Sequence, residues 1–260
     1  MKVLFLGDII GEPGRAAIKA LLPELKKELG IDFTIANGEN SAGGFGITGK
    51  VLDELLSMGI DVVTSGNHIW DKKEVMQIID TETRLLRPAN YPDGVAGFGY
   101  RIYDGPNKTR IAVLNLEGRV YLSNIDCPFR VSKKLVDKIK AETNIIIVDF
   151  HAEITSEKNA LGQYLDGEVS AFFGTHTHIQ TADERVLPGG TAYITDAGMC
   201  GSLDSVIGIK KENAWQRFLY DIPVRFEVAT ANVKINGVLV EIDEKTGRAL
   251  SIIRISREHK

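Results

Sequence analysis

The chain has 260 residues, of which 43% are hydrophobic and 25% are charged, and its formal net charge at pH 7 is -4. This composition is typical of an ordinary globular protein and excludes disordered and fibrous chains. Because no basic excess is present to neutralise a phosphate backbone, we expect no long nucleic acid as a partner. A chain of this length suits one hydrophobic core, so we predict a single domain over residues 1–260.

The first predicted elements alternate between strand and helix. Residues 3–7 form an apolar run that ends in Gly-Asp and predicts a strand, and residues 12–29 carry apolar side chains at helical spacing. Further strands are predicted at residues 33–36, 62–65, 111–116, 145–150 and 169–173, and further helices at residues 51–57 and 132–143. This alternation indicates an α/β protein whose sheet is covered by helices on both faces.

After about residue 189 the pattern changes to strands. They are predicted at residues 191–195, 224–229, 238–242 and 249–255, with a turn at residues 243–247. Because no linker, low-complexity tract or internal repeat separates this part from the rest, we expect these strands to complete the same domain as a second sheet packed on the first.

Nothing in the sequence indicates an export signal or a membrane span. The apolar run at residues 3–6 is too short for a signal-peptide core, and no later stretch approaches the length of a membrane span. We therefore expect a cytoplasmic protein. Cys127 and Cys200 are too few for a disulfide framework and too far apart for a zinc knuckle, so we interpret them as ordinary buried or loop thiols.

Four of the five histidines directly follow predicted strands, and they are His68, His151, His176 and His178. Strand ends on one edge of an α/β sheet are where loops converge on a site, so side chains distant in sequence can meet there. Asp8 and Glu39 occupy equivalent positions after the first and second strands. The sequence therefore predicts one polar site built from several strand ends.

The residue types at these positions indicate metal binding. Each one alone has an ordinary structural interpretation, since an Asp after a strand is often a helix cap and an Asn-His pair is often a turn. Together they form a set of metal-ligand types: Asp8, Glu39, Asn40, Asn67, His151, His176 and His178. Seven ligands are too many for one tetrahedral ion, so we predict two ions. Imidazole, carboxylate and amide ligands without thiolate suit iron, manganese or zinc.

The motifs also resemble a known superfamily. Gly66-Asn67-His68, a strand that ends in His151, and His176-Thr177-His178 resemble the ligand series of the calcineurin-like metallophosphoesterases. Two departures stand out, since that superfamily usually has D-x-H and G-D-x-x-D where this chain has Asp8-Ile9-Ile10 and Gly38-Glu39-Asn40. Both departures are shared by the bacterial YmdB-like metallophosphoesterases, which this sequence resembles over essentially its whole length.

The resemblance implies a fold, a ligand assignment and an activity. The fold is a two-sheet metallophosphoesterase sandwich with four layers, α/β/β/α, and a dinuclear metal site at the C-terminal strand ends. The first ion is held by Asp8, Glu39, Asn40 and His178, and the second by Glu39, Asn67, His151 and His176, so that Glu39 bridges them. The implied activity is hydrolysis of small phosphodiesters, notably 2',3'-cyclic nucleotides.

This interpretation predicts a mechanism and leaves alternatives open. Two ions share a bridging hydroxide that attacks phosphorus, and His68, which is spare in the ligand count, donates a proton to the leaving group. An amide oxygen in place of an imidazole makes the first site harder and favours iron or manganese over zinc. A phosphomonoesterase or nucleotidase, or a regulatory binding protein on the same fold, remains an alternative. The substrate, the native metal and any homo-oligomer stay open.

Overall fold

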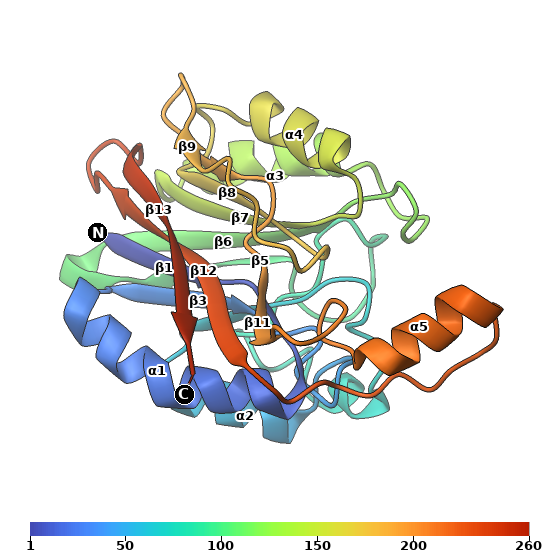
Figure 1. Cartoon of the computed structure of the whole chain (residues 1–260). Helices are drawn as coiled ribbons and strands as arrows, with labels where there is room; N and C mark the ends of the chain where they lie inside the picture. The colour runs from blue at the N-terminus through green and yellow to red at the C-terminus, as the bar shows by residue number, and fades with distance from the viewer. Residues whose placement is uncertain (260) are drawn as a thin grey trace.

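The computed structural model describes residues 1–259, which form two β-sheets with helices outside them (Figure 1). The helices are α1 (Gly11–Leu29), α2 (Gly49–Ser57), α3 (Pro128–Lys140), α4 (Thr155–Tyr164) and α5 (Lys211–Tyr220), with 3-10 helices η1 (Lys73–Gln77) and η2 (Pro106–Lys108).

The first sheet combines strands from both ends of the chain. Its order is β2 (Asp8–Ile9), β11 (Met199–Ser202), β12 (Val233–Ile242), β1 (Lys2–Leu6), β3 (Phe33–Asn37) and β4 (Val62–Thr64), and β13 (Ala249–Glu258) pairs with β12. Strands β1, β3 and β4 are parallel, so their carboxyl ends lie at one edge. Strand β12 runs antiparallel to β1.

The second sheet comes from the middle of the chain. Its order is β5 (Tyr100–Asp104), β6 (Arg110–Glu117), β7 (Ile145–His151), β8 (Ala171–Thr175), β10 (Ala192–Ile194) and β9 (Arg185–Val186). The central strands β6, β7, β8 and β10 are parallel, which gives this sheet one edge of carboxyl ends as well.

Because successive side chains of each strand point to opposite faces of its sheet, the buried residues form three layers: one between the two sheets and one between each sheet and its helices. On β1, Val3 and Phe5 face the second sheet, where the Phe5 and Phe173 ring centroids are 4.9 Å apart, whereas Leu4 and Leu6 face α1. On the far side, α3 and α4 cover the outer face of β6, β7 and β8. The predicted four-layer α/β/β/α sandwich is therefore confirmed (Figure 1).

Three details of the prediction were wrong. Of the predicted C-terminal strands, β10 lies in the second sheet, but β12 and β13 join β1 in the first sheet and extend its apolar face. Residues 224–229 are not a strand, since only an isolated bridge between Ile209 and Val228 pairs this segment. Helix α5, which precedes it, was not predicted, and it projects from the body of the molecule (Figure 1).

Within residues 1–259, none of the helices combines the length and the apolar character that crossing a membrane requires.

Candidate metal centre

The predicted site residues lie where the carboxyl ends of both sheets meet. Asp8 comes two residues after β1, Glu39 and Asn40 follow β3, and Asn67 follows β4. From the second sheet, His151 is the last residue of β7, and His176 and His178 lie just beyond β8. Because the carboxyl ends of both sheets lie at the same end of the sandwich, residues that are up to 170 positions apart in the sequence (8 to 178) come together there.

Four of these side chains form a first group around Asp8. The Asp8 carboxylate is buried, and its Oδ1 lies 3.7 Å from His178 Nε2. Asn40 Nδ2 donates to Glu39 Oε1 at 3.1 Å and lies 3.3 Å from His178 Nε2. The sequence predicted a ligand oxygen from Asn40, whereas the structure turns the amide nitrogen inward; a half turn of the amide group exchanges the two atoms.

A second group surrounds the ring of His151. Its Nε2 lies 3.0 Å from Glu39 Oε1, 3.2 Å from Asn67 Oδ1 and 2.9 Å from His176 Nδ1. Glu39 thus contacts members of both groups, as expected for a bridging carboxylate. Grouped in this way, the side chains correspond to the two ligand sets that the superfamily resemblance implies, although Asp8 also accepts from the backbone N–H of His176 at 3.1 Å.

Each of the three histidines has a hydrogen-bond acceptor on the nitrogen that points away from the centre. His178 Nδ1 lies 2.8 Å from the carbonyl oxygen of Ile207, and His176 Nε2 lies 3.0 Å from Glu153 Oε2. His151 Nδ1 lies 3.0 Å from Thr175 Oγ1. Because carbonyl and carboxylate oxygens only accept, the outer nitrogens of His178 and His176 carry the proton, and their inner nitrogens present a lone pair to the centre.

The outer nitrogen of His151, Nδ1, also carries a proton, as the hydrogen bonds of a buried carboxylate beneath the ring show. Thr175 Oγ1 donates to Asp149 Oδ1 at 2.7 Å, and Thr64 and Asn37 donate to Asp149 Oδ2. Burial raises the pKa of Asp149 to about 6, but all three neighbouring groups donate to its oxygens and favour the ionised form, which only accepts. Since the Thr175 hydroxyl donates its one proton to Asp149, it must accept from His151 Nδ1–H.

This arrangement is suited to binding cations. Among residues 1–259, ligand atoms of Glu39, His151 and His176 all lie within 4.8 Å of one another. Asp8 Oδ1 is a buried oxygen without a hydrogen-bond partner. Two imidazole lone pairs and a carboxylate in contact require a positive charge between them, and a group of this composition fits divalent metal ions.

The pKa values of these groups also indicate a site that favours a positive charge. Burial acts against the charge on Glu39 and on His151, but their attraction outweighs it and moves the pKa of Glu39 to about 2 and that of His151 to about 9. Burial raises the pKa of Asp8, and burial together with the neighbouring His151 lowers the pKa of His176 to about 3. These shifts place one positive charge beside Glu39, which either a proton on His151 Nε2 or a bound cation in its place can supply.

The backbone approaches this centre closely at Gly66. A Cβ atom at this position would lie 2.2 Å from the ring of His151 and 2.5 Å from Glu39 Oε2. Any side chain at residue 66 would therefore displace two of the predicted ligands, which explains the glycine before Asn67.

A buried ion pair holds the loop that carries His176 and His178. Both histidines have positive φ angles, +96° and +66°, which non-glycine residues rarely adopt. Between them, Thr177 donates through its backbone N–H and its hydroxyl to Asp196, whose carboxylate also binds Lys158 Nζ at 2.7 Å. These contacts stabilise the strained loop.

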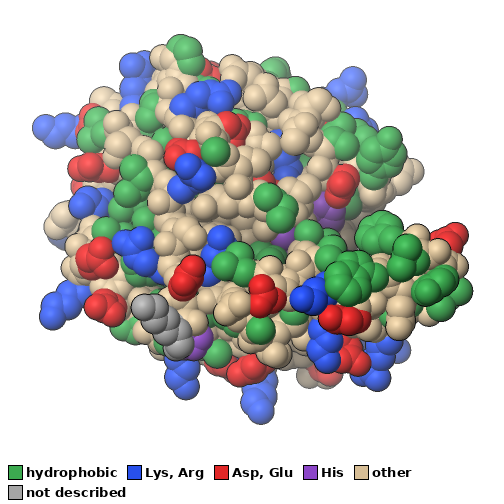
Figure 2. Space-filling view, viewed as in Figure 1, with side chains coloured by type: hydrophobic (Ala, Val, Ile, Leu, Met, Phe, Trp, Pro, Cys, Tyr) green, Lys and Arg blue, Asp and Glu red, His purple; other side chains and the backbone are tan. Residues whose placement is uncertain are grey.

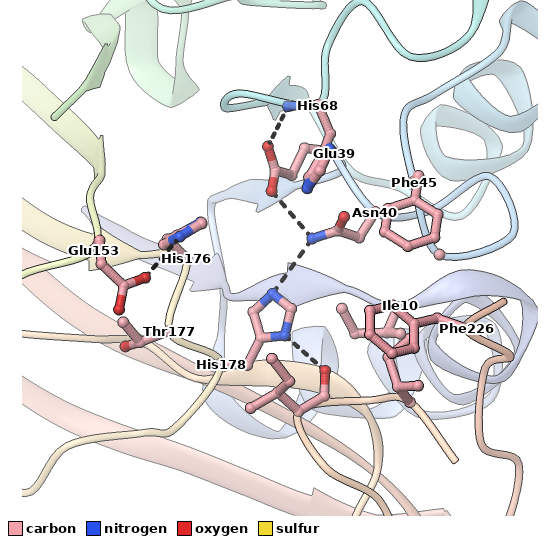
Figure 3. A pocket seen from close by; sticks show the side chains of 13 residues that line it. Ile10, Glu39, Asn40, Phe45, His68, Glu153, His176, Thr177, His178 and Phe226 are labelled. Carbon is pink, nitrogen blue, oxygen red and sulfur yellow. Dashed lines mark hydrogen bonds and ion pairs between the residues drawn. The ribbon is translucent and has the colours of Figure 1, made fainter. Parts of the chain in front are cut away.

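The centre opens into a cavity of about 340 Å³. Figure 2 shows histidine side chains at the bottom of a hollow beside the projecting α5. Figure 3 shows Glu153 and His176 on one side of this cavity and the rings of Phe45 and Phe226 on the other. His68 also lines it, with its backbone N–H donating to Glu39 Oε2 at 3.1 Å and its Nδ1 2.8 Å from Asp71 Oδ2.

The supporting residues of the centre were not predicted from the sequence. Thr175 and Asp149 could have been found, because strand periodicity places them on the inner face of β8 and β7, where a polar side chain requires a partner. Glu153, Lys158 and the carbonyl of Ile207 gave no comparable signal, because only the folded chain brings them to the histidines.

The sequence matches known proteins over almost its whole length. The family model described as YmdB-like protein matches residues 4–255. The chain is 48% identical over 255 residues to a Bacillus subtilis (strain 168) protein named 2',3'-cyclic-nucleotide 2'-phosphodiesterase, covering 98% of this chain and 96% of the relative.

Two solved structures extend the comparison. One, described as a novel phosphatase, from Mycoplasma pneumoniae, superimposes with a TM-score of 0.93 at 38% identity, covering 99% of this chain and 93% of the other. The other, the calcineurin-like phosphoesterase YfkN from Bacillus subtilis, has a TM-score of 0.57 at 12% identity, covering 99% and 90%. At this identity the likeness shows a calcineurin-like fold alone.

Proposed function

Because this chain belongs to the YmdB-like protein family, we propose that it is a metal-dependent phosphodiesterase that hydrolyses small phosphodiesters, with 2',3'-cyclic nucleotides as substrates. The observation that carries the proposal is the meeting of two groups of ligand side chains at the buried carboxylate of Glu39. The name of the Bacillus subtilis relative supplies the substrate class.

The proposed metal assignment follows the two groups. Asp8, Glu39, Asn40 and His178 would hold one ion, and Glu39, Asn67, His151 and His176 the other. Divalent ions bound there would lower the pKa of a water molecule and neutralise the charge of the phosphoryl group. Two amide ligands and two carboxylates make iron or manganese the favoured metal, with zinc as the other candidate.

His68 is the proposed proton donor. Water adds across the bond between phosphorus and O2' of the cyclic ester, which leaves a 3'-phosphate and requires a proton on the departing O2'. The His68 side chain lines the cavity and is 29% exposed, so substrate can reach it. In the protonated ring, Asp71 would accept from Nδ1–H and orient the imidazolium, which leaves Nε2–H to be donated to the leaving group.

A phosphomonoesterase is the second candidate, because the similar Mycoplasma pneumoniae protein is described as a phosphatase. A panel of 2',3'-cyclic nucleotides and 2'-, 3'- and 5'-nucleoside monophosphates, tested on protein loaded with iron, manganese or zinc, separates the two. We expect close to two metal equivalents per chain and cyclic esters cleaved faster than any monophosphate. Faster release of phosphate from the monophosphates would overturn the diesterase proposal, and a single equivalent at full activity would overturn the dinuclear one.

A further inference from the structure

The cavity above the metal centre has a polar half and an apolar half. The polar half consists of the predicted ligands with Glu153 and His68. The apolar half is lined by Ile10, Phe45, Ile207, Ile209 and Phe226 (Figure 3). A substrate with a charged end and a flat apolar end would match both halves at once.

Two phenyl rings from separate parts of the chain are placed to contact the apolar end of such a substrate. Phe45, in the loop after β3, packs edge-on against the ring of His68 with centroids 5.4 Å apart. Phe226, in the extended segment after α5, leaves 39% of its surface exposed. In Figure 3 the two rings lie on the same side of the cavity, opposite Glu153.

A strained turn places the third apolar side chain. Val206 and Ile209 exchange both backbone hydrogen bonds, and the two residues between them, Ile207 and Gly208, have φ angles of +48° and +98°. A β-branched residue is rare at positive φ, so the turn carries a cost that a glycine or asparagine would avoid. The turn contributes to the site in two ways. The Ile207 carbonyl oxygen accepts from His178, and Ile207, a residue that is 47% exposed, lines the cavity.

We infer that Phe226, with Ile207 and Phe45 beside it, is a nucleobase subsite that binds the base by stacking and apolar contact while the cyclic phosphate occupies the polar half. The inference rests on the proposed function. The side chains of the apolar half have no hydrogen-bonding groups, so they contact the face of the base and form no hydrogen bonds to its edge. The subsite therefore accepts purine and pyrimidine bases, since every base has a π-face.

The test compares two cyclic esters that differ only in the base. The probes are 2',3'-cyclic AMP and the 2',3'-cyclic phosphate of methyl ribofuranoside, which lacks a base. For Phe226→Ala, the ratio of kcat/KM for the nucleotide to kcat/KM for the base-free ester should fall about 10-fold, mainly through KM, as expected for one lost stacking partner. Phe226→Trp should restore the ratio.

Phe218→Ala is the matched control, because Phe218 is 82% exposed on α5 and does not line the cavity. Its ratio should equal that of the unaltered protein. If Phe226→Ala leaves the ratio unchanged, or lowers both rates equally, the subsite is wrong while the proposed activity stands. If the metal-loaded, unaltered protein cleaves neither ester, the proposed function itself fails and the subsite with it.

Discussion

Replacing Thr175 by valine tests the hydrogen bonds beneath the metal centre. The Thr175 hydroxyl accepts from His151 Nδ1 at 3.0 Å and donates to Asp149 Oδ1 at 2.7 Å. Valine has nearly the same shape without the hydroxyl group. It leaves the proton of His151 Nδ1 without an acceptor and makes the other tautomer, with the proton on Nε2, accessible. That proton would point at Glu39 and remove the lone pair from the centre.

The burial of these groups determines which general magnitudes apply. His151 and Asp149 are fully buried, so no water replaces the lost contacts, and an orphaned buried donor costs about 1–3 kcal/mol of the free energy of unfolding. Loss of the partner that orients a metal-binding histidine typically lowers metal affinity about 10- to 100-fold. We therefore expect Thr175→Val to lose affinity chiefly for the ion that His151 would hold.

Two control variants separate metal binding from stability. Thr64→Val removes a comparable buried hydrogen bond to Asp149 that touches no histidine, and Thr175→Ser keeps the hydroxyl. Elemental analysis after dialysis against a graded chelator series measures affinity, and urea unfolding measures stability. Thr64→Val should have a lower free energy of unfolding but keep its metals. Thr175→Ser should keep its free energy of unfolding, and its metal affinity should stay within about threefold of the unaltered protein. Equal metal loss in Thr64→Val and Thr175→Val would refute the reasoning.

Three further outcomes follow from the centre. Glu39→Ala should lower metal content at both sites and Asn40→Ala at one, because Glu39 contacts both ligand groups whereas Asn40 contacts only Glu39 and His178 of the first group; equal losses by elemental analysis would contradict the bridging position of Glu39. His68→Ala should keep its metals and lose about 10²–10⁴-fold in rate on an ester with an alkoxide leaving group, but much less on an activated aryl ester, and equal losses on both would rule out proton donation. Ile207→Asn should raise the free energy of unfolding by about 1 kcal/mol, because asparagine tolerates the positive φ that a β-branched residue does not. The same variant should have a lower kcat/KM for cyclic nucleotides. A lower free energy of unfolding in urea would show that the turn is unstrained.

The sequence by itself determined the positions of the main strands and the chemistry at their ends. Alternating apolar residues specify which face of a strand is buried, and parallel strands bring their carboxyl ends to one edge, so residues such as Asp8, Glu39 and His151 could be expected to meet from the strand pattern alone. The superfamily resemblance supplied the division of the ligands into two sets. Their role in metal binding stays a prediction.

Only the tertiary structure decided which strands share a sheet and which groups support the histidines. Strand β12 could pair with β1 or lie in a separate sheet with the same local pattern, and its place is set by the packing of Val238 and Val240 against the second sheet. The partners of His151 and His178 are 24 and 29 residues away from them along the chain. The sequence shows which side chains can form hydrogen bonds. Their partners depend on how the whole chain packs, and no local sequence pattern contains that information.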